Sequence, residues 1–240
     1  MSNIEKFLEM VQESDNIVFF GGAGVSTESG IPDFRSVDGL YNQKYDYSPE
    51  TILSHTFYMR HTEEFYRFYR DKMLCLDAKP NVTHQKLAEL EAAGKVKAVI
   101  TQNIDGLHQM AGSRRVLELH GSVHRNYCQK CGKGFDAEYI LKSGTEIPLC
   151  DACGGKIKPD VVLYEEGLNQ QTLEDAVFYI SHADVLIIGG TSLAVYPAAG
   201  LIDYYRGNKL VLINKSTTPM DGRADLLIQA GLGEVFSQIR

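Results

Sequence analysis

Short apolar runs that each end in a glycine or a polar motif recur along this chain, and they constrain its fold more than any other feature. The first run, Ile17 to Phe20, leads directly into a glycine-rich turn. Similar runs occupy residues 97–101, 116–119, 184–188 and 209–213. Apolar residues at helical spacing precede the first run, in residues 4–11, and lie between several of the others. Because apolar strands that alternate with helices are typical of a parallel sheet covered on both faces, the sequence predicts an α/β fold.

Two longer stretches interrupt this alternation. Residues 36–79 are rich in Tyr, Phe and Arg and have helical spacing around residues 63–75, whereas residues 124–159 are rich in Cys, Gly and Lys. We expect both stretches to be insertions that form a smaller lobe beside the sheet. The sheet domain would then comprise the remaining residues, 1–35, 80–123 and 160–240.

Four of the five cysteines form two Cys-x-x-Cys pairs, Cys128 with Cys131 and Cys150 with Cys153. This spacing is typical of a zinc ribbon with four thiolate ligands. Because four protein ligands leave no open position on the metal, the predicted zinc ion is structural. Cys75 is left over in an apolar helical stretch, and we expect it to be a core residue.

Charge and hydropathy limit the possible partners. The formal net charge of −7 argues against a broad nucleic-acid-binding surface, which needs clustered Lys and Arg, and it suits basic protein segments better. The N-terminus has no secretory-type apolar segment, and no run approaches the ~20 apolar residues of a membrane span. The sequence predicts a cytoplasmic protein that binds neither membranes nor nucleic acid directly.

The glycine-rich turn spans residues 21–35, with the sequence GGAGVSTESGIPDFR. Glycines let a backbone approach a pyrophosphate, and the Ser26 and Thr27 hydroxyls could donate hydrogen bonds to it. Any tight turn would also need glycines, so a purely structural turn is the alternative. Thr27 stands where the third glycine of a dehydrogenase turn should be, and no later strand ends in the acidic residue that usually binds the ribose. An ordinary dehydrogenase is therefore disfavoured.

Polar motifs also follow the later apolar runs. They are TQNIDGLH at residues 101–108, ELHGS at 118–122, GGTS at 189–192 and Asn214. The carboxyl ends of parallel strands meet at the ligand crevice of an α/β sheet, so these side chains are binding candidates. Capping of a helix by Asn103 or Asp105 is the alternative for the first motif. His120 has a side chain suited to general-base chemistry near neutral pH.

Together these motifs resemble the sirtuin family over nearly the whole chain, from Ile17 to Ile239: GAGVSTESGIPDFR, TQNIDGLH, LHGS, the paired Cys-x-x-Cys, KPDVV and GGTSLAVYPAA. The resemblance implies a Rossmann-like NAD-binding domain with a small lobe made of a zinc ribbon and helices. It also implies NAD-dependent removal of an acyl group from a protein lysine. The acyl group would pass to ADP-ribose, and nicotinamide would be released.

The resemblance further implies a role for each matching residue. His120 would be the base that activates a ribose hydroxyl, and Asn103 would order the reacting ribose together with Gln102. Asp105 with Ile104 would hold the nicotinamide carboxamide. The residues implied to bind NAD are Ala23, Thr27, Phe34, Arg35, Gln102, Ile104, Asp105, His120, Thr191, Ser192, Asn214 and Leu232.

The partners implied by the resemblance are acylated lysines in proteins or peptides. The peptide would add as a strand to residues 160–164, with contacts from Val161, Val162 and Tyr164, and to the loop after Ser192. The chain departs from the family here: it reads Tyr164-Glu165-Glu166 where Phe-Gly-Glu is common, so a glycine of the peptide-binding edge is lost.

A second departure concerns the acyl group. Sirtuins that prefer succinyl or malonyl groups carry a Tyr-x-x-Arg pair, whereas the matching place here reads Tyr66-Arg67-Phe68-Tyr69. We therefore predict acetyl and short aliphatic acyl groups as substrates. Two alternatives remain open: a mono-ADP-ribosyltransferase that uses the same NAD site, and a non-catalytic NAD-binding or zinc-binding interaction module.

Overall fold

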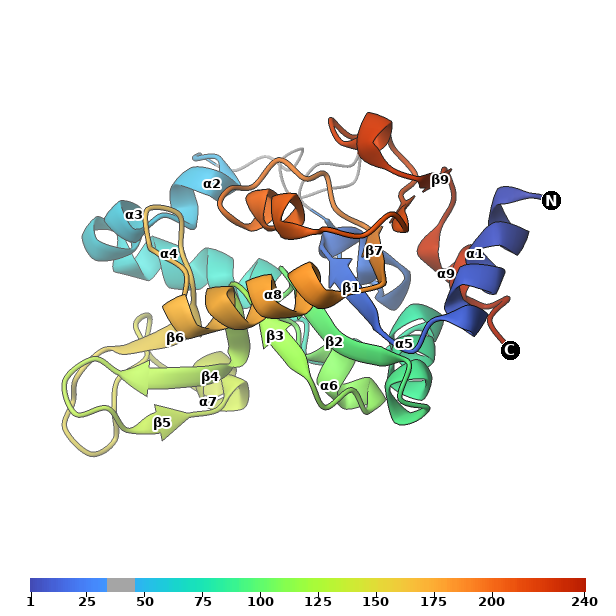
Figure 1. The fold of residues 1–240 in the computed structure, drawn as a ribbon. Coiled ribbons are helices and arrows are strands. Elements are labelled where there is room, and N and C mark those ends of the chain that lie inside the picture. The colour runs from blue at the N-terminus through green and yellow to red at the C-terminus, as the bar shows by residue number, and fades with distance from the viewer. Residues whose placement is uncertain (34–45) are drawn as a thin grey trace.

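The computed structural model describes residues 1–33 and 46–240. Within these residues the centre of the fold is a six-stranded sheet in the order β3-β2-β1-β7-β8-β9 (Figure 1). Its strands are β1 (Ile17–Gly21), β2 (Val96–Thr101), β3 (Val116–Glu118), β7 (Val185–Gly189), β8 (Leu210–Ile213) and β9 (Leu226–Ile228). All neighbouring pairs are parallel. Counted in chain order this is the 3-2-1-4-5-6 arrangement of a Rossmann fold, so the predicted fold class is confirmed.

Five of the six strands coincide with the apolar runs in the sequence, and β9 does not. Its three residues form too short a run to be distinguished from a buried loop segment. The strand exists because it pairs with β8, from Val211 against Leu226 to Ile213 against Ile228. The Asn3 side chain donates a hydrogen bond to the Leu227 carbonyl at 2.9 Å, which places the first helix against this edge.

Helices cover both faces of the sheet because successive strand residues point to opposite sides. Ile17 and Phe19 belong to one buried cluster with α1 (Asn3–Glu13), α5 (Val82–Ala92) and α9 (Leu232–Phe236). Val18 and Phe20 belong to another, with α8 (Gln170–His182) and η5 (Ala198–Tyr204). Burial on both sides explains why the strands are continuously apolar.

The two interrupting stretches pack together as a smaller lobe (Figure 1). One part is a three-stranded antiparallel sheet, β5-β4-β6, with helix α7. The other part is helical. The elements of the lobe are β4 (Gly121–Cys128), β5 (Gly134–Phe135), β6 (Ile157–Val161), α7 (Ala137–Lys142), α2 (Pro49–Ile52), α3 (His55–Arg60), α4 (Thr62–Phe68) and η4 (Tyr69–Met73). Phe65 and Tyr66 share one apolar cluster with Ile140 and Ile157, and the Tyr66 hydroxyl donates to the Ile157 carbonyl. The exact domain bounds stay a prediction.

Gly121 joins the two sheets. It follows His120 directly and has a φ of 76°. A Cβ at this position would lie 1.9 Å from the Asp160 carbonyl oxygen, so β6 approaches closely because there is no side chain. The Val162 amide also donates to the His120 carbonyl at 3.0 Å. The glycine therefore fixes His120 at the boundary between the sheet and the lobe.

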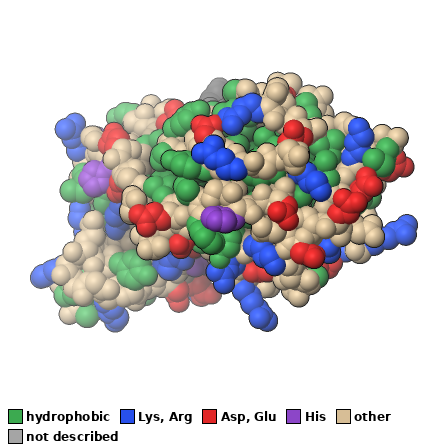
Figure 2. Space-filling model, in the orientation of Figure 1, with side chains coloured by type: hydrophobic (Ala, Val, Ile, Leu, Met, Phe, Trp, Pro, Cys, Tyr) green, Lys and Arg blue, Asp and Glu red, His purple; other side chains and the backbone are tan. Residues whose placement is uncertain are grey.

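Surface charge and helix length bear on the partners of the chain. Figure 2 shows Lys and Arg interspersed with Asp and Glu on the face that carries α8, so no extended basic surface forms there. In the described part of the chain, every helix is too short or too polar to span a bilayer.

Two histidines are buried beneath the loop that holds Asp105. His84 on α5 and His108 on α6 (Leu107–Ala111) have exposed fractions of 0% and 1%, and their ring centroids lie 4.7 Å apart. Among the described residues, His84 Nε2 and both ring nitrogens of His108 have no hydrogen-bond partner. Burial lowers the pKa of His84 to about 4 and that of His108 to about 3, from an ordinary value of 6.5. Both rings are therefore neutral at pH 7.

This pair predicts acid lability. The unfolded chain binds protons at these rings below pH 6.5 and the folded chain does not, so the free energy of unfolding falls as pH falls. The expected slope is about 1.4 kcal/mol per pH unit for each histidine once the pH is well below 6.5. Urea unfolding between pH 7 and 5 measures it. The His108→Asn variant should have a shallower slope; an unchanged slope would contradict this origin.

Candidate active site

A cavity of about 620 Å³ opens where the strand order reverses, between β1 and β7, at the carboxyl edge of the sheet. It extends to the small lobe. The predicted site residues that line it are Ala23, Thr27, Gln102, Asn103, Ile104, Asp105, His120, Val161, Val162, Tyr164, Thr191, Ser192, Asn214 and Leu232. Phe34 and Arg35 lie outside the described residues. The sequence prediction therefore converges on one cavity, and His120 and Asp105 share it.

The glycine-rich turn packs against the turn after β7. The Gly24 amide donates to the Gly190 carbonyl at 2.8 Å, and a Cβ on Gly24 would lie 2.7 Å from Gly190 Cα. Two short 3₁₀ turns, η1 (Ala23–Val25) and η2 (Thr27–Ser29), follow β1. The Thr27 hydroxyl donates to the Gly24 carbonyl at 3.1 Å. These glycines are required by backbone packing as well as by ligand access.

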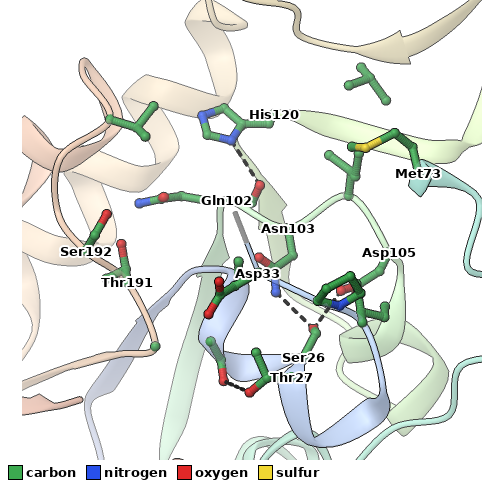
Figure 3. A pocket seen from close by; sticks show the side chains of 18 of the residues that line it. Ser26, Thr27, Asp33, Met73, Gln102, Asn103, Asp105, His120, Thr191 and Ser192 are labelled. Carbon is green, nitrogen blue, oxygen red and sulfur yellow. Dashed lines mark hydrogen bonds between the residues drawn. The ribbon is translucent and has the colours of Figure 1, made fainter. Parts of the chain in front are cut away.

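The Ser26 hydroxyl connects two motifs that lie far apart in the sequence (Figure 3). It donates to Asp105 Oδ2 at 2.6 Å and accepts from Asn103 Nδ2 at 3.0 Å. Asp105 Oδ1 accepts from the Leu107 amide at 2.9 Å. Asp105 thus accepts from the first residue of α6, but the N-cap of that helix is Gly106 and no side chain caps it, so the alternative of an N-cap by Asn103 or Asp105 is wrong. The Ser26 hydroxyl, expected at a phosphate, serves this network instead.

Sequence reasoning missed His124, which lies at the start of the predicted ribbon insertion. The His124 ring hydrogen-bonds through Nε2 to the Asp105 carbonyl at 2.9 Å. A Cβ on Gly106 would lie 2.8 Å from that ring, so the loop packs on it. No local signal marks this contact, because it joins a loop of the large sheet to β4.

His120 is held in one tautomer. Its Nδ1 lies 2.9 Å from the Gln102 carbonyl oxygen (Figure 3). Because a carbonyl oxygen only accepts, Nδ1 carries the proton and Nε2 is left as the basic nitrogen. Burial lowers the pKa of His120 below 6.5, although the Gln102 hydrogen bond opposes this. The neutral imidazole needed for a general base is therefore the form present at pH 7.

The Gln102 side chain indicates that a polar ligand or water binds in the cavity. Its Nε2 is buried and has no hydrogen-bond partner among the described residues. A buried amide donor that lines a cavity is costly unless a ligand or water accepts from it. Together with amide, carboxylate and imidazole groups on one wall, this arrangement fits a polar ligand such as NAD.

The two tyrosines that match the Tyr-x-x-Arg pair, Tyr66 and Tyr69, do not line the cavity. Tyr66 and Tyr69 have exposed fractions of 0% and pack inside the small lobe, so they are not part of the cavity wall. Arg70 is not available there either, since its guanidinium donates to the Ile140 and Glu146 carbonyls. The residues of this segment that line the cavity are Lys72, Met73, Cys75 and Leu76.

The expectation that Cys75 is a core residue is wrong. Its thiol is only half-buried and lines the cavity, close enough to Asp105 for that carboxylate to raise the pKa of the thiol along with burial. The helical segment ends with η4 at Met73. Cys75 therefore lies beyond the apolar helix in which the sequence analysis placed it.

The four paired cysteines form a metal-binding cluster. Their sulfur atoms all lie within 4.8 Å of one another, and none forms a disulfide. Each pair forms a turn closed by a glycine amide, from Gly132 to the Cys128 carbonyl at 2.9 Å and from Gly154 to the Cys150 carbonyl at 2.8 Å. Four thiolates at this spacing fit a tetrahedral zinc ion with no open position.

Known proteins share this arrangement. The Sir2 family model matches residues 22–197. An NAD-dependent protein deacetylase of Clostridium acetobutylicum is 61% identical over 241 residues, covering 100% of this chain and 98% of that protein. One from Clostridium perfringens is 57% identical over 239 residues, covering 98% of each. A solved Sir2 complex with a p53 peptide and NAD⁺ has a TM-score of 0.88 at 43% identity, covering 100% of this chain and 97% of that one.

Removal of zinc should unfold the three-stranded sheet and leave the six-stranded sheet folded. Structural zinc sites supply about 10–16 kcal/mol of binding free energy to small folds, and the two Cys-x-x-Cys turns of this sheet meet at the metal cluster. Hydrogen exchange of residues 121–161 and 185–189, before and after chelation, measures the difference. Metal analysis should give one zinc per chain, retained in the Cys75→Ser control; unchanged exchange in residues 121–161 after zinc loss would contradict the prediction.

Proposed function

The chain belongs to the Sir2 family and is an NAD-dependent protein deacetylase, and from this premise we propose how its own residues share the reaction. When bound, NAD would supply the ribose carbon that the acyl oxygen bonds as the bond to nicotinamide breaks, with acylated ADP-ribose and free lysine as the other products. The observation that carries the proposal is the meeting of His120, Asp105 and the glycine-rich turn in one cavity. Burial of polar groups from distant segments in one cavity costs desolvation free energy, and their interactions with a single bound ligand would offset that cost.

His120 is the general base. The Gln102 carbonyl keeps the proton on Nδ1, so that Nε2 accepts a proton from a ribose hydroxyl. Asn103 orders the reacting ribose, and its amide is already oriented by the Ser26 hydroxyl. Gln102 offers its unpartnered amide to the same part of the ligand. Preorientation of these groups lowers the barrier because no reorganisation is needed at the moment of reaction.

Asp105 and Ile104 hold the nicotinamide carboxamide, and the other end of NAD lies along the remaining strand ends. Thr191, Ser192, Asn214 and Leu232 serve the adenosine half. Ala23 and Thr27 serve the phosphates, and the roles expected of Phe34 and Arg35 fall outside the described residues. The Ser26 network connects the nicotinamide loop to the phosphate turn, so one connected set of residues serves the nicotinamide and the phosphates of NAD.

The substrate is an acylated lysine in a protein or peptide that lies between the sheet and the small lobe. Its backbone adds to residues 160–164, with Val161, Val162 and Tyr164 in contact. Related solved structures hold acetylated and propionylated peptides. Met73 and Leu76 offer apolar contacts to an acetyl or short aliphatic group. The enzyme acts in the cytoplasm, where the thiolate cluster stays reduced.

Replacement of His120 by Ala tests the base. Turnover of acetylated peptide should fall by about 10²–10⁴-fold, whereas binding of NAD should weaken far less. Peptide-dependent nicotinamide release measures turnover, and calorimetry measures NAD binding. His182→Ala, on α8 and outside the cavity, is the matched control. Deacylation that persists in His120→Ala would remove this residue as the base, and protein labelling by NAD without any need for peptide would favour mono-ADP-ribosylation.

The pH dependence of kcat/KM follows from the lowered pKa of His120. The neutral imidazole is the active form, so activity should persist as pH falls through 6.5 and decline only at lower pH. Rates with acetylated peptide between pH 5 and 8 measure this limb. A midpoint at or above 6.5 would contradict the assignment.

A panel of acyl groups on one peptide tests selectivity. Acetyl and propionyl peptides should be turned over about 10–100-fold more efficiently than the succinyl peptide, because an unpaired carboxylate is costly to bury. Lys72 on the cavity wall forms an ion pair with Asp71 at 3.1 Å. A succinyl preference that the Lys72→Met variant abolishes would overturn the prediction and assign the acyl end to Lys72.

A further inference from the structure

Two residues with left-handed backbone lie in the two segments expected to contact the peptide. Among the described non-glycine residues, positive φ occurs at Glu165, with 76°, and at Leu193, with 54°. Glu165 follows Tyr164 at the end of the predicted peptide-binding edge, and Leu193 follows Ser192. Such a backbone costs of order 1–3 kcal/mol and persists only where its surroundings impose it, often at functional sites. The contacts of Glu165 identify what imposes it here.

The Glu165 carboxylate binds the first turn of α3. Its Oε2 accepts from the Thr56 amide at 2.9 Å and from the Thr56 hydroxyl at 2.7 Å. These two hydrogen bonds lower the pKa of Glu165 below its ordinary value, so the side chain is an anion at neutral pH. Because two donors of Thr56 hold this carboxylate, the side chain restricts the backbone conformation of Glu165.

The residues on either side of Glu165 bind the same turn. The Tyr164 carbonyl accepts from the His55 amide at 2.9 Å, and the Tyr164 amide donates to the Leu53 carbonyl at 3.0 Å. Glu166 Oε1 lies 2.9 Å from His55 Nδ1. In Figure 1 the segment that follows β6 accordingly rises beside α3. The segment is therefore attached to the helical part of the small lobe at three consecutive residues.

We propose that Glu165 is a positioning residue for the acylated peptide, because its carboxylate holds Thr56 and thereby sets the path of the Val161–Tyr164 edge. The inference rests on the proposed function of that edge. Glu165 acts through Thr56, which is the residue that its carboxylate hydrogen-bonds within the described part of the chain. Its effect therefore falls on peptide binding, while the positions of His120 and Asp105 are set by Gln102 and Ser26.

These contacts explain how the segment accommodates Glu165 where the family commonly has glycine. Glycine would adopt a φ of 76° without strain, and glutamate at this position compensates for the strain through its side chain. The contact between Glu165 and Thr56 then holds the edge against α3. With glycine at this position, only the backbone hydrogen bonds of Tyr164 and the contact of Glu166 would hold it.

Steady-state kinetics on the full chain with an acetylated peptide test this role. Glu165→Ala should raise the peptide KM about tenfold, with kcat and the NAD KM within about twofold, because a charged hydrogen-bond acceptor is lost. Glu165→Gln should recover most of the affinity, since its amide oxygen still accepts from Thr56. Thr56→Val should raise the peptide KM less than Glu165→Ala. The double variant should be no worse than Glu165→Ala, because the two residues act as one unit.

Controls separate the possible failures. Glu174→Ala, an exposed carboxylate on α8, should leave the peptide KM unchanged. If Glu165→Ala does not fold, Glu165→Gly removes the same acceptor without strain and should show the same rise in peptide KM. An unchanged peptide KM, an equal rise in the NAD KM, or equal losses in the Gln and Ala variants would each overturn the proposal. Wild-type protein without peptide-dependent nicotinamide release would instead refute the proposed function.

Discussion

The common direction of the six described strands is the constraint on which the rest of the structure depends. Because every strand of the central sheet ends at the same edge, short motifs separated by tens of residues meet there without any direct sequence relation. The reversal of strand order between β1 and β7 then opens a cavity at that edge. The Ser26 hydroxyl completes the arrangement, since it fastens the turn after β1 to the loop after β2.

The small lobe forms the other wall of the cavity, and a few residues attach it to the central sheet. Gly121 lets β6 approach the residue that follows His120, and His124 supports the loop that carries Asp105. The metal cluster lies at the far end of the same strands. A zinc ion held by this cluster would therefore be connected to the wall of the cavity through β4 and β6.

Periodicity and motif spacing predicted what depends on neighbours in the sequence. The buried strands, the cysteine cluster and the polar strand ends all belong to this class, because each has a local pattern. Contacts between distant segments had no such pattern. The hydrogen bond from Ser26 to Asp105 depends on how two loops of the central sheet meet. The burial of Tyr66 and the half-exposure of Cys75 depend on how the small lobe packs. Strand β9 was missed because three residues carry too little periodicity, and pairing with β8 decides its conformation.

The position of the first helix has a consequence for solution behaviour. Strand β9 is at the edge of the sheet, and the Asn3 side chain occupies one of its carbonyl groups at 2.9 Å. An uncovered strand edge is a template on which another chain can add in register and begin aggregation. The opening turn of the chain thus covers part of that template, and loss of Asn3 would free the Leu227 carbonyl to pair with a strand of another chain.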